Sequence, residues 1–224
     1  MKFIFAAVFI LCGLVFAVGQ NEQSPIVEKD IEYKDWVYKN VQTGADMNLR
    51  KFTLGKKLVM VVYFAPWCGN WKHDLPFVQS MYEKYKINGF DVVAVGEYDP
   101  IDSMKAHIAQ YKLAFPVVWE SDARTAKQTT SHYEYRKSVG DTRNWGSPWY
   151  LFLEVNKLQP NGSVIAKRAP IVNGELIQPD AEKFIREKLG LRATSDLSAS
   201  FGNATEVCDP AKPSTSLVKP EIKP

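Results

Sequence analysis

The chain has 224 residues, 46% of them hydrophobic, which fits one globular domain with extensions. Its formal net charge of +3 is small, and no basic stripe is interleaved with aromatic residues, so the composition excludes a typical nucleic-acid-binding protein. The three histidines and three cysteines lack the close spacing of ligand sets, so we predict no metal site and no bound cofactor.

Residues 1–19 have the pattern of a secretory signal peptide: a positive start, an apolar stretch over residues 3–18 and a small-residue end. We predict that the chain is exported, to the periplasm or the medium, and does not stay at a membrane after cleavage; an uncleaved N-terminal anchor is the alternative. Cys12 leaves with the signal. Cys68 and Cys208 then remain in an oxidising compartment, either as one disulfide or as one reactive thiol and a bystander.

Residues 20–44 are polar and are predicted to form an N-terminal extension, in which 31–38 is either a strand or a short helix. The main domain is predicted over residues 45–191. Its first central strand is 58–64, because a nearly continuous apolar run is typical of a strand buried on both faces. An amphipathic helix over 70–87 follows, and Asn88-Gly89 ends it.

The rest of the domain alternates between strand-like and helix-like segments, which predicts an α/β fold. A turn at Asn161-Gly162 is expected to join the last two strands as a hairpin, and Asp180 is expected to cap the last helix. The further elements predicted are strands at 91–96, 115–119, 151–155 and 164–167, and helices at 102–112, 125–136 and 181–189.

Cys68 stands at the junction between the first central strand and the helix after it. Free backbone N–H groups at the start of a helix favour negative charge, so a cysteine placed there is favoured as the thiolate, which is the nucleophilic form. Cys68 is therefore a candidate nucleophile.

The residues around Cys68 follow a recognisable pattern. An apolar strand is followed by Phe-x-Ala-x-Trp-Cys, then a basic residue, then an acidic residue two positions before a proline. This pattern resembles the thioredoxin superfamily, closest to the TlpA-type and redoxin (AhpC/TSA-like) thiol-disulfide oxidoreductases. The resemblance implies a thioredoxin-like fold, with a central mixed sheet flanked by helices. The matching residues are Phe64, Ala65, Trp67, Cys68, Lys72, Asp74 and Pro76.

The second cysteine of the family motif is absent, because Trp71 occupies its position. In the family, the first cysteine attacks a disulfide and the second resolves the mixed disulfide. A reductase that works through Cys-x-x-Cys alone is therefore excluded. Val62 also stands where thioredoxins carry a buried carboxylate that transfers protons.

Pro148 matches the proline that precedes the fourth strand of the family and faces the reactive cysteine through a cis peptide bond. A cis bond is inexpensive only before proline, and it turns the preceding backbone toward the thiol. We predict cis, although a trans turn proline fits the local sequence equally well. The residues predicted to contact substrate are Trp67, Trp71, Ser147, Pro148 and Trp149.

Residues 192–224 are rich in Ser, Pro and Lys, which predicts a flexible, disordered tail. The segment Glu206-Val-Cys208 within it is similar to the tail of two-cysteine peroxiredoxins that carries the resolving cysteine. Cys208 is therefore a candidate resolving residue. A flexible tail of this length reaches on the order of 25 Å, enough to return toward Cys68.

The remaining polar candidates are interpreted as surface residues. His73 and Asp74 are expected to be solvated helix residues, and His107 and His132 to lie on the surface. For a peroxidase site, Ala65 occupies the position at which peroxiredoxins place a threonine.

Three hypotheses remain. The first is a thiol-disulfide exchange protein in which Cys68 attacks and Cys208 or an external thiol resolves, with protein thiols or disulfides or an external thiol reductant as partners. The second is a non-catalytic module that binds peptides or proteins, and the third is a peroxiredoxin-like thiol peroxidase. The sequence does not reveal the oligomeric state.

Overall fold

The computed structural model describes residues 22–191; Cys12, Cys208, the predicted signal and the predicted tail lie outside that range. The helices are α1 (Leu49–Thr53), α2 (Gly69–Tyr85), α3 (Ile101–Tyr111), α4 (Ser131–Ser138) and α5 (Gln178–Leu189), with 3₁₀ turns η1 (Lys86–Asn88), η2 (Arg124–Thr129) and η3 (Val155–Lys157). The strands are β1 (Gln23–Ser24), β2 (Val27–Lys34), β3 (Val37–Asn40), β4 (Asp46–Asn48), β5 (Leu58–Phe64), β6 (Phe90–Gly96), β7 (Val117–Trp119), β8 (Trp149–Glu154), β9 (Val164–Val172) and β10 (Glu175–Leu176).

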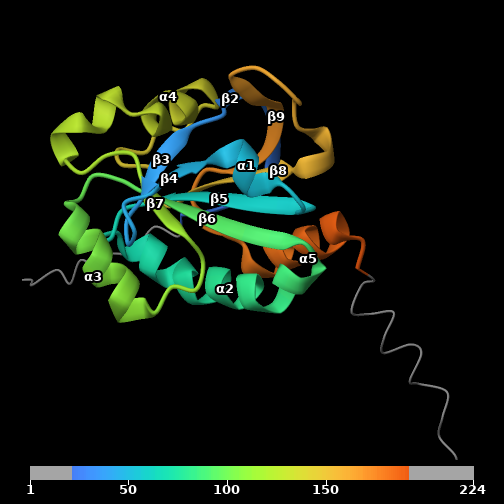
Figure 1. The fold of residues 1–224 in the computed structure, drawn as a ribbon, viewed down its shortest axis with the longest axis horizontal. Coiled ribbons are helices and arrows are strands. Elements are labelled where there is room, and N and C mark those ends of the chain that lie inside the picture. The colour runs from blue at the N-terminus through green and yellow to red at the C-terminus, as the bar shows by residue number, and fades with distance from the viewer. Residues whose placement is uncertain (1–21, 192–224) are drawn as a thin grey trace, which may run out of the picture.

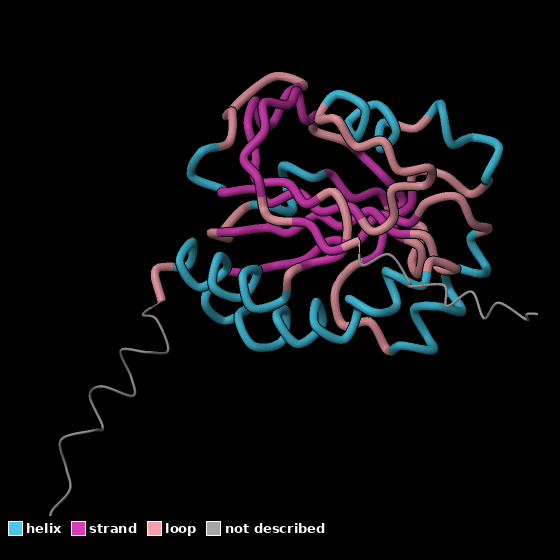
Figure 2. Tube along the Cα trace, turned by 180° about the vertical axis from the view of Figure 1, so that it is seen from behind, coloured by secondary structure: helices cyan, strands magenta, loops and turns pink. Residues whose placement is uncertain are grey.

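A mixed sheet in the order β2-β9-β8-β5-β6-β7-β3-β4 forms the centre of the fold. Strands β5, β6 and β7 are parallel, and β8 runs antiparallel to β5. Helices α2 and α5 cover one face, and α1 and α4 lie on the other (Figure 1). The view from behind shows the strands enclosed between these layers (Figure 2). The predicted α/β architecture with a central mixed sheet is confirmed.

Strand β5 holds the two layers together, because all seven of its residues are fully buried. Met60, Val62 and Phe64 face the core beneath α2, α3 and α5, while Val61 and Tyr63 face the core beneath α1 and α4. This alternation places opposite faces of one strand in two hydrophobic cores. The prediction of a strand buried on both sides is confirmed.

The segment predicted as an extension contributes strands to the main sheet. Strand β2 pairs antiparallel with β9, and β3 pairs antiparallel with β7. Residues 31–38 therefore belong to two strands rather than to a helix, with a break at Asp35 and Trp36.

One local prediction holds in part and two were wrong. Strands β8 and β9 pair antiparallel as predicted, and the chain turns between Gln159 and Ile165, where Gly162 has a φ of 86°; the connection is longer than a tight hairpin because η3 lies between the two strands. The predicted helix at 125–136 is split, because the Thr130 side chain accepts a hydrogen bond from the Tyr133 amide and starts α4 there. Asp180 does not cap α5, which begins at Gln178 with Ile177 as the N-cap residue.

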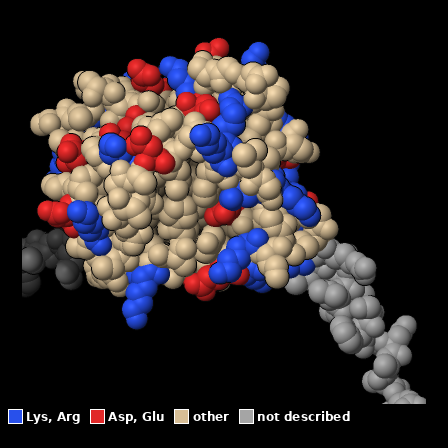
Figure 3. Space-filling view, in the orientation of Figure 1, with Lys and Arg blue, Asp and Glu red and all other residues tan. Residues whose placement is uncertain are grey.

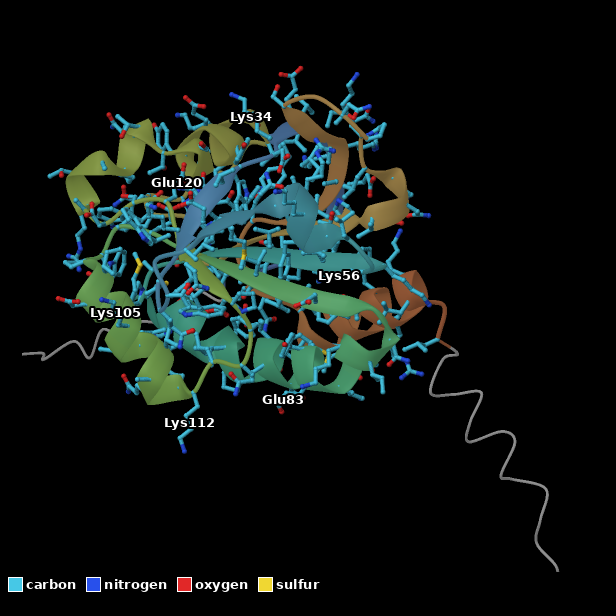
Figure 4. All side chains as sticks on the ribbon, viewed as in Figure 1. Lys34, Lys56, Glu83, Lys105, Lys112 and Glu120 are labelled. Atoms are coloured by element: carbon cyan, nitrogen blue, oxygen red, sulfur yellow. The ribbon has the colours of Figure 1, made fainter. Side chains whose placement is uncertain are left out.

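A buried carboxyl lies at the end of β6. Glu97 is 0% exposed, and neither of its oxygens has a hydrogen-bond partner among residues 22–191. Glu120, at the end of β7, accepts hydrogen bonds from the Ser131 and His132 amides at the start of α4 (2.6 and 3.2 Å) and is labelled beside that helix in Figure 4. Burial first, and the neighbouring Glu120 second, raise the pKa of Glu97 well above its ordinary value.

We predict that Glu97→Gln has a larger free energy of unfolding than wild type at neutral pH, and that this difference grows as pH rises. The pKa of Glu97 is raised in the folded state, so the unfolded chain releases the proton first, near pH 4.5, and wild-type stability falls above that pH. The neutral amide removes this loss. Urea unfolding of both proteins at several pH values should show free energies that converge below pH 4.5 and a growing advantage of the variant above it; a constant difference would contradict the assignment.

Candidate functional site

Cys68 lies between the end of a central strand and the start of the next helix. Strand β5 ends at Phe64, and Cys68 is the N-cap residue of α2, with its carbonyl accepting the Lys72 amide at 3.2 Å. The thiol is half-buried and donates to the Ser147 carbonyl, with the sulfur 3.1 Å from the oxygen. The predicted strand–cysteine–helix junction is confirmed.

The peptide bond between Ser147 and Pro148 is cis, as predicted. The Ser147 hydroxyl accepts a hydrogen bond from the Ala65 amide at 2.9 Å, three residues before the cysteine. Ser147 thus contacts the motif twice, through its hydroxyl and its carbonyl. The two segments are brought together although they are about 80 residues apart.

A buried ion pair holds the loop that carries Ser147. The Arg136 guanidinium and the Asp141 carboxylate, both at most 2% exposed, meet at 2.9 Å. Arg136 also donates to the carbonyls of Trp145, at 3.0 Å, and Arg143. Gly146 has a φ of 59°, and a Cβ added there would run into the Arg136 guanidinium. Sequence analysis missed this cluster.

Arg143 completes the cluster from the loop itself. It donates to Asp141 at 2.8 Å and to the Pro148 carbonyl at 3.0 Å. Burial alone would raise the pKa of Asp141, but hydrogen bonds and charges from Arg143 and Arg136 outweigh it and lower the pKa to about 2. The carboxylate therefore stays ionised, and the loop remains tied down, at neutral pH.

Trp71 fills the core and does not line a binding surface. It is 0% exposed, packs against Phe64 at 5.0 Å between ring centroids, and donates from its indole nitrogen to His107 Nε2 at 2.9 Å. Burial, and then Lys72, lower the pKa of His107 to about 4, so the imidazole is neutral and can accept this bond. The prediction of His107 as a surface residue was wrong.

Asp74 is also buried, contrary to the prediction of a solvated residue. It is 0% exposed and accepts hydrogen bonds from the Tyr150 hydroxyl at 2.7 Å and the Leu176 amide at 2.8 Å. Burial raises the pKa of Asp74 despite these two bonds. Tyr150 lies opposite Val62 in the sheet, so the Asp74 carboxyl contacts the strand next to the one that carries Val62.

Two further expectations about side-chain position need correction. Trp149 is 0% exposed and donates to Asn173 at 2.8 Å, so it cannot contact a substrate at the surface. His132 is fully buried; its Nδ1 hydrogen-bonds the Tyr98 hydroxyl at 2.9 Å. Of the predicted contact residues, Trp67 alone is partly exposed. Ser147 and Pro148 are buried, and the Ser147 carbonyl accepts the hydrogen bond from the Cys68 thiol.

Within residues 22–191, no group of three His, Cys, Asp or Glu side chains could hold a metal ion. Over the same range, no helix has the length and apolar character needed to cross a membrane.

Comparison with known proteins identifies relatives of two kinds. A sequence profile of the AhpC/TSA family matches residues 30–141, which is 112 of the 224 residues. The chain is 29% identical over 122 residues to the thiol-disulfide oxidoreductase ResA of Oceanobacillus iheyensis, covering 52% of this chain but only 64% of that relative, less than two thirds. It is 24% identical over 176 residues to a probable phospholipid hydroperoxide glutathione peroxidase of Helianthus annuus, covering 73% and 91%.

Two solved structures from Chlorobium tepidum share the fold. A putative thiol:disulfide interchange protein DsbE has a TM-score of 0.51 at 22% identity, covering 72% of this chain and 98% of that one. A thiol:disulfide interchange protein of the thioredoxin family has a TM-score of 0.53 at 16% identity, with the same coverage. The predicted thioredoxin-like fold is confirmed.

We predict that Arg136→Met lowers the free energy of unfolding by about 3 kcal/mol, because it removes one partner of a buried ion pair and leaves two loop carbonyls without a donor. Arg143 still neutralises Asp141, which keeps the loss near this value. Urea denaturation measures it. The matched control is Arg168→Met, at an exposed arginine, which should change stability by less than about 0.5 kcal/mol; equal losses in both would contradict the assigned role.

Proposed function

Because the chain belongs to the AhpC/TSA family, we propose that it is a thiol-disulfide exchange protein with Cys68 as its attacking residue. The Cys68 thiolate attacks one sulfur of a partner's disulfide, and the other partner sulfur leaves as a thiolate and takes up a proton. A second thiol then attacks the Cys68 sulfur of the mixed disulfide and releases the partner fully reduced. That thiol comes from Cys208 or from an external reductant, and Cys68 is left in a disulfide with it. The two electrons that reduce the partner come from these two thiols, and further external thiol reduces the new disulfide and regenerates Cys68.

The observation that carries this proposal is the position of the Cys68 thiol, at the start of α2 and 3.1 Å from the carbonyl before a cis proline. The helix start favours the thiolate, and the turned backbone at Ser147 offers hydrogen-bonding groups to an extended partner chain. An approaching chain would displace the bond from the thiol to the Ser147 carbonyl. The two relatives, from Oceanobacillus iheyensis and Helianthus annuus, are both named as redox enzymes.

The buried Asp74 carboxyl and the Tyr150 hydroxyl that it binds support a proton-transfer role. Asp74 accepts a hydrogen bond from the Tyr150 hydroxyl. Burial first, then Asp74, and to a smaller extent the charges of Glu175 and Cys68, raise the pKa of that hydroxyl well above its ordinary value. A carboxyl whose pKa burial has raised exchanges protons closer to neutral pH. We assign Asp74 as the group that takes up and returns protons as thiols form and react.

Export belongs to the proposal, on the pattern of residues 1–19. An oxidising compartment supplies disulfide-bonded proteins as substrates and permits a disulfide between Cys68 and Cys208 as the resting oxidised state.

A thiol peroxidase is the second candidate, favoured by the Helianthus annuus relative, whose match spans 91% of that protein. In this case Cys68 attacks the O–O bond of a hydroperoxide, releases an alcohol and becomes a sulfenic acid. Consumption of hydroperoxide in the presence of a thiol donor at enzymatic rates would favour this function over disulfide exchange.

The proposal predicts that the reduced protein reacts with a disulfide-bonded peptide to give a mixed disulfide on Cys68. Acid quenching and mass spectrometry should detect it in wild type, and Cys68→Ser should abolish it. Cys208→Ser should form the adduct but release it more slowly if the tail cysteine resolves it; unchanged release would assign resolution to the external thiol. Disulfide reduction that survives in Cys68→Ser would refute the proposal.

Replacing Trp71 tests why the second cysteine is missing. Trp71→Cys restores the family spacing, and we predict faster reduction of peptide disulfides because the mixed disulfide can then be resolved locally. Loss of the buried indole should cost about 3 kcal/mol or more of unfolding free energy. Trp71→Ala is the matched control, with a similar cavity and no thiol. Equal turnover in the two variants would contradict a resolving role for position 71.

A further inference from the structure

Two tryptophans border the reactive thiol. Trp67 immediately precedes Cys68, and Trp145 lies two residues before Ser147. Their rings pack edge to face, with centroids 5.3 Å apart, and both side chains remain partly exposed. Both rings thus belong to segments that also carry the thiol and its hydrogen-bond partner Ser147.

A cation from η2 lies over each ring. The Arg124 guanidinium is 4.8 Å from the centroid of Trp67, and the Lys127 ammonium is 4.7 Å from that of Trp145. Lys127 also donates to the Asn144 side chain at 2.7 Å. Cation–π contacts hold both charges at the site while leaving them able to bind an anion.

Neither cation is neutralised within the described part of the chain, where no carboxylate forms an ion pair with Arg124 or Lys127. The neighbouring arginines differ, because Arg136 and Arg143 are paired with Asp141. The indole N–H of Trp67 is buried and also lacks a hydrogen-bond partner over residues 22–191.

We term these four residues the donor rim (Trp67, Arg124, Lys127 and Trp145). Arg124 and Lys127 supply its hydrogen-bond donors and positive charge, and the two tryptophan rings hold those cations next to the motif. We propose that the donor rim binds carboxylates of an acidic polypeptide segment whose cysteine exchanges with Cys68. The inference rests on the proposed function and names its substrate class. Two cations side by side suit an extended segment, in which side chains two residues apart lie about 7 Å apart on one face.

The preference for an acidic segment must come from the donor rim itself and not from the charge of the whole surface. Lys and Arg side chains are interspersed with Asp and Glu over the face shown in Figure 3, so that face offers no broad field of one sign. Asp122, exposed two residues before Arg124, forms no ion pair within residues 22–191 and opposes the binding of an acidic segment. Asp122→Asn should therefore strengthen the preference.

The test uses the full mature chain and three peptide disulfides with two Glu, two Gln or two Lys residues flanking the cysteine. Wild type should react with the acidic peptide about tenfold faster than with the basic one, and the difference should shrink with added salt. Arg124→Gln combined with Lys127→Gln should reduce the ratio to within about twofold. Equal rates in wild type, or a ratio that survives in the double variant, would overturn the proposal.

The matched control removes two charges from the opposite edge of the sheet. Lys86 follows the end of α2, and Lys112 follows the end of α3. Each lysine therefore lies near the edge of the sheet where the next parallel strand begins, whereas Cys68 follows the end of a parallel strand. Figure 4 labels Lys112 far from Glu120, which follows the end of β7. Lys86→Gln combined with Lys112→Gln should leave the acidic-to-basic ratio at its wild-type value. A loss equal to that of the rim variant would show that net charge, not the rim, selects the partner.

A binding measurement separates this inference from the proposed function. Peptides with serine in place of cysteine are titrated into the chain while tryptophan fluorescence is recorded. If no peptide disulfide reacts with Cys68, the exchange function fails, but tighter binding of the acidic peptide that depends on Arg124 and Lys127 still supports the rim. Equal binding of acidic and basic peptides overturns the rim. If Cys68 reacts with glutathione disulfide in a way that depends on Arg124 and Lys127, but shows no preference for acidic peptides, then the donor rim does not bind a polypeptide and the proposal fails.

Discussion

The site depends on one buried ion pair, between Arg136 and Asp141. The pair holds the loop of residues 141–148 against the sheet, and that loop carries the cis proline and the Ser147 carbonyl that accepts the Cys68 thiol. A buried charge pair offers little net stability over an apolar pair, but each partner left alone is costly, so it imposes one arrangement. The loop is therefore specified by electrostatics rather than by its own sequence pattern.

The structure also shows the role of the residue three positions after Cys68. Trp71 is a core residue, bound to a neutral His107 from α3 and packed on the end of β5. Such a side chain cannot move out to serve as a contact surface without opening a cavity. Cys68 is the one cysteine within residues 22–191, so under the proposed exchange function a resolving thiol comes from outside that range.

A buried acid is nevertheless present, from a different place. Thioredoxins carry it on the strand where this chain has Val62; here Asp74 provides a carboxyl from α2 and reaches the adjacent strand through Tyr150. The same low-polarity environment raises the pKa of both groups. In the donor rim, by contrast, Arg124 is exposed to solvent.

The sequence by itself determined the buried strand at 58–64 and the cysteine at the start of the next helix, because these follow from an apolar run and from the preferences of a few neighbouring residues. The cis bond before Pro148 was expected only from the family resemblance, since the local sequence allowed trans equally, and the structure decided it. Only the tertiary structure decided that Asp74, His107 and His132 are buried, that Arg136 pairs with Asp141, and that Arg124 covers Trp67. Asp74 meets Tyr150 across 76 residues and Trp71 meets His107 across 36. Burial of a polar side chain depends on such distant partners, which local periodicity does not encode.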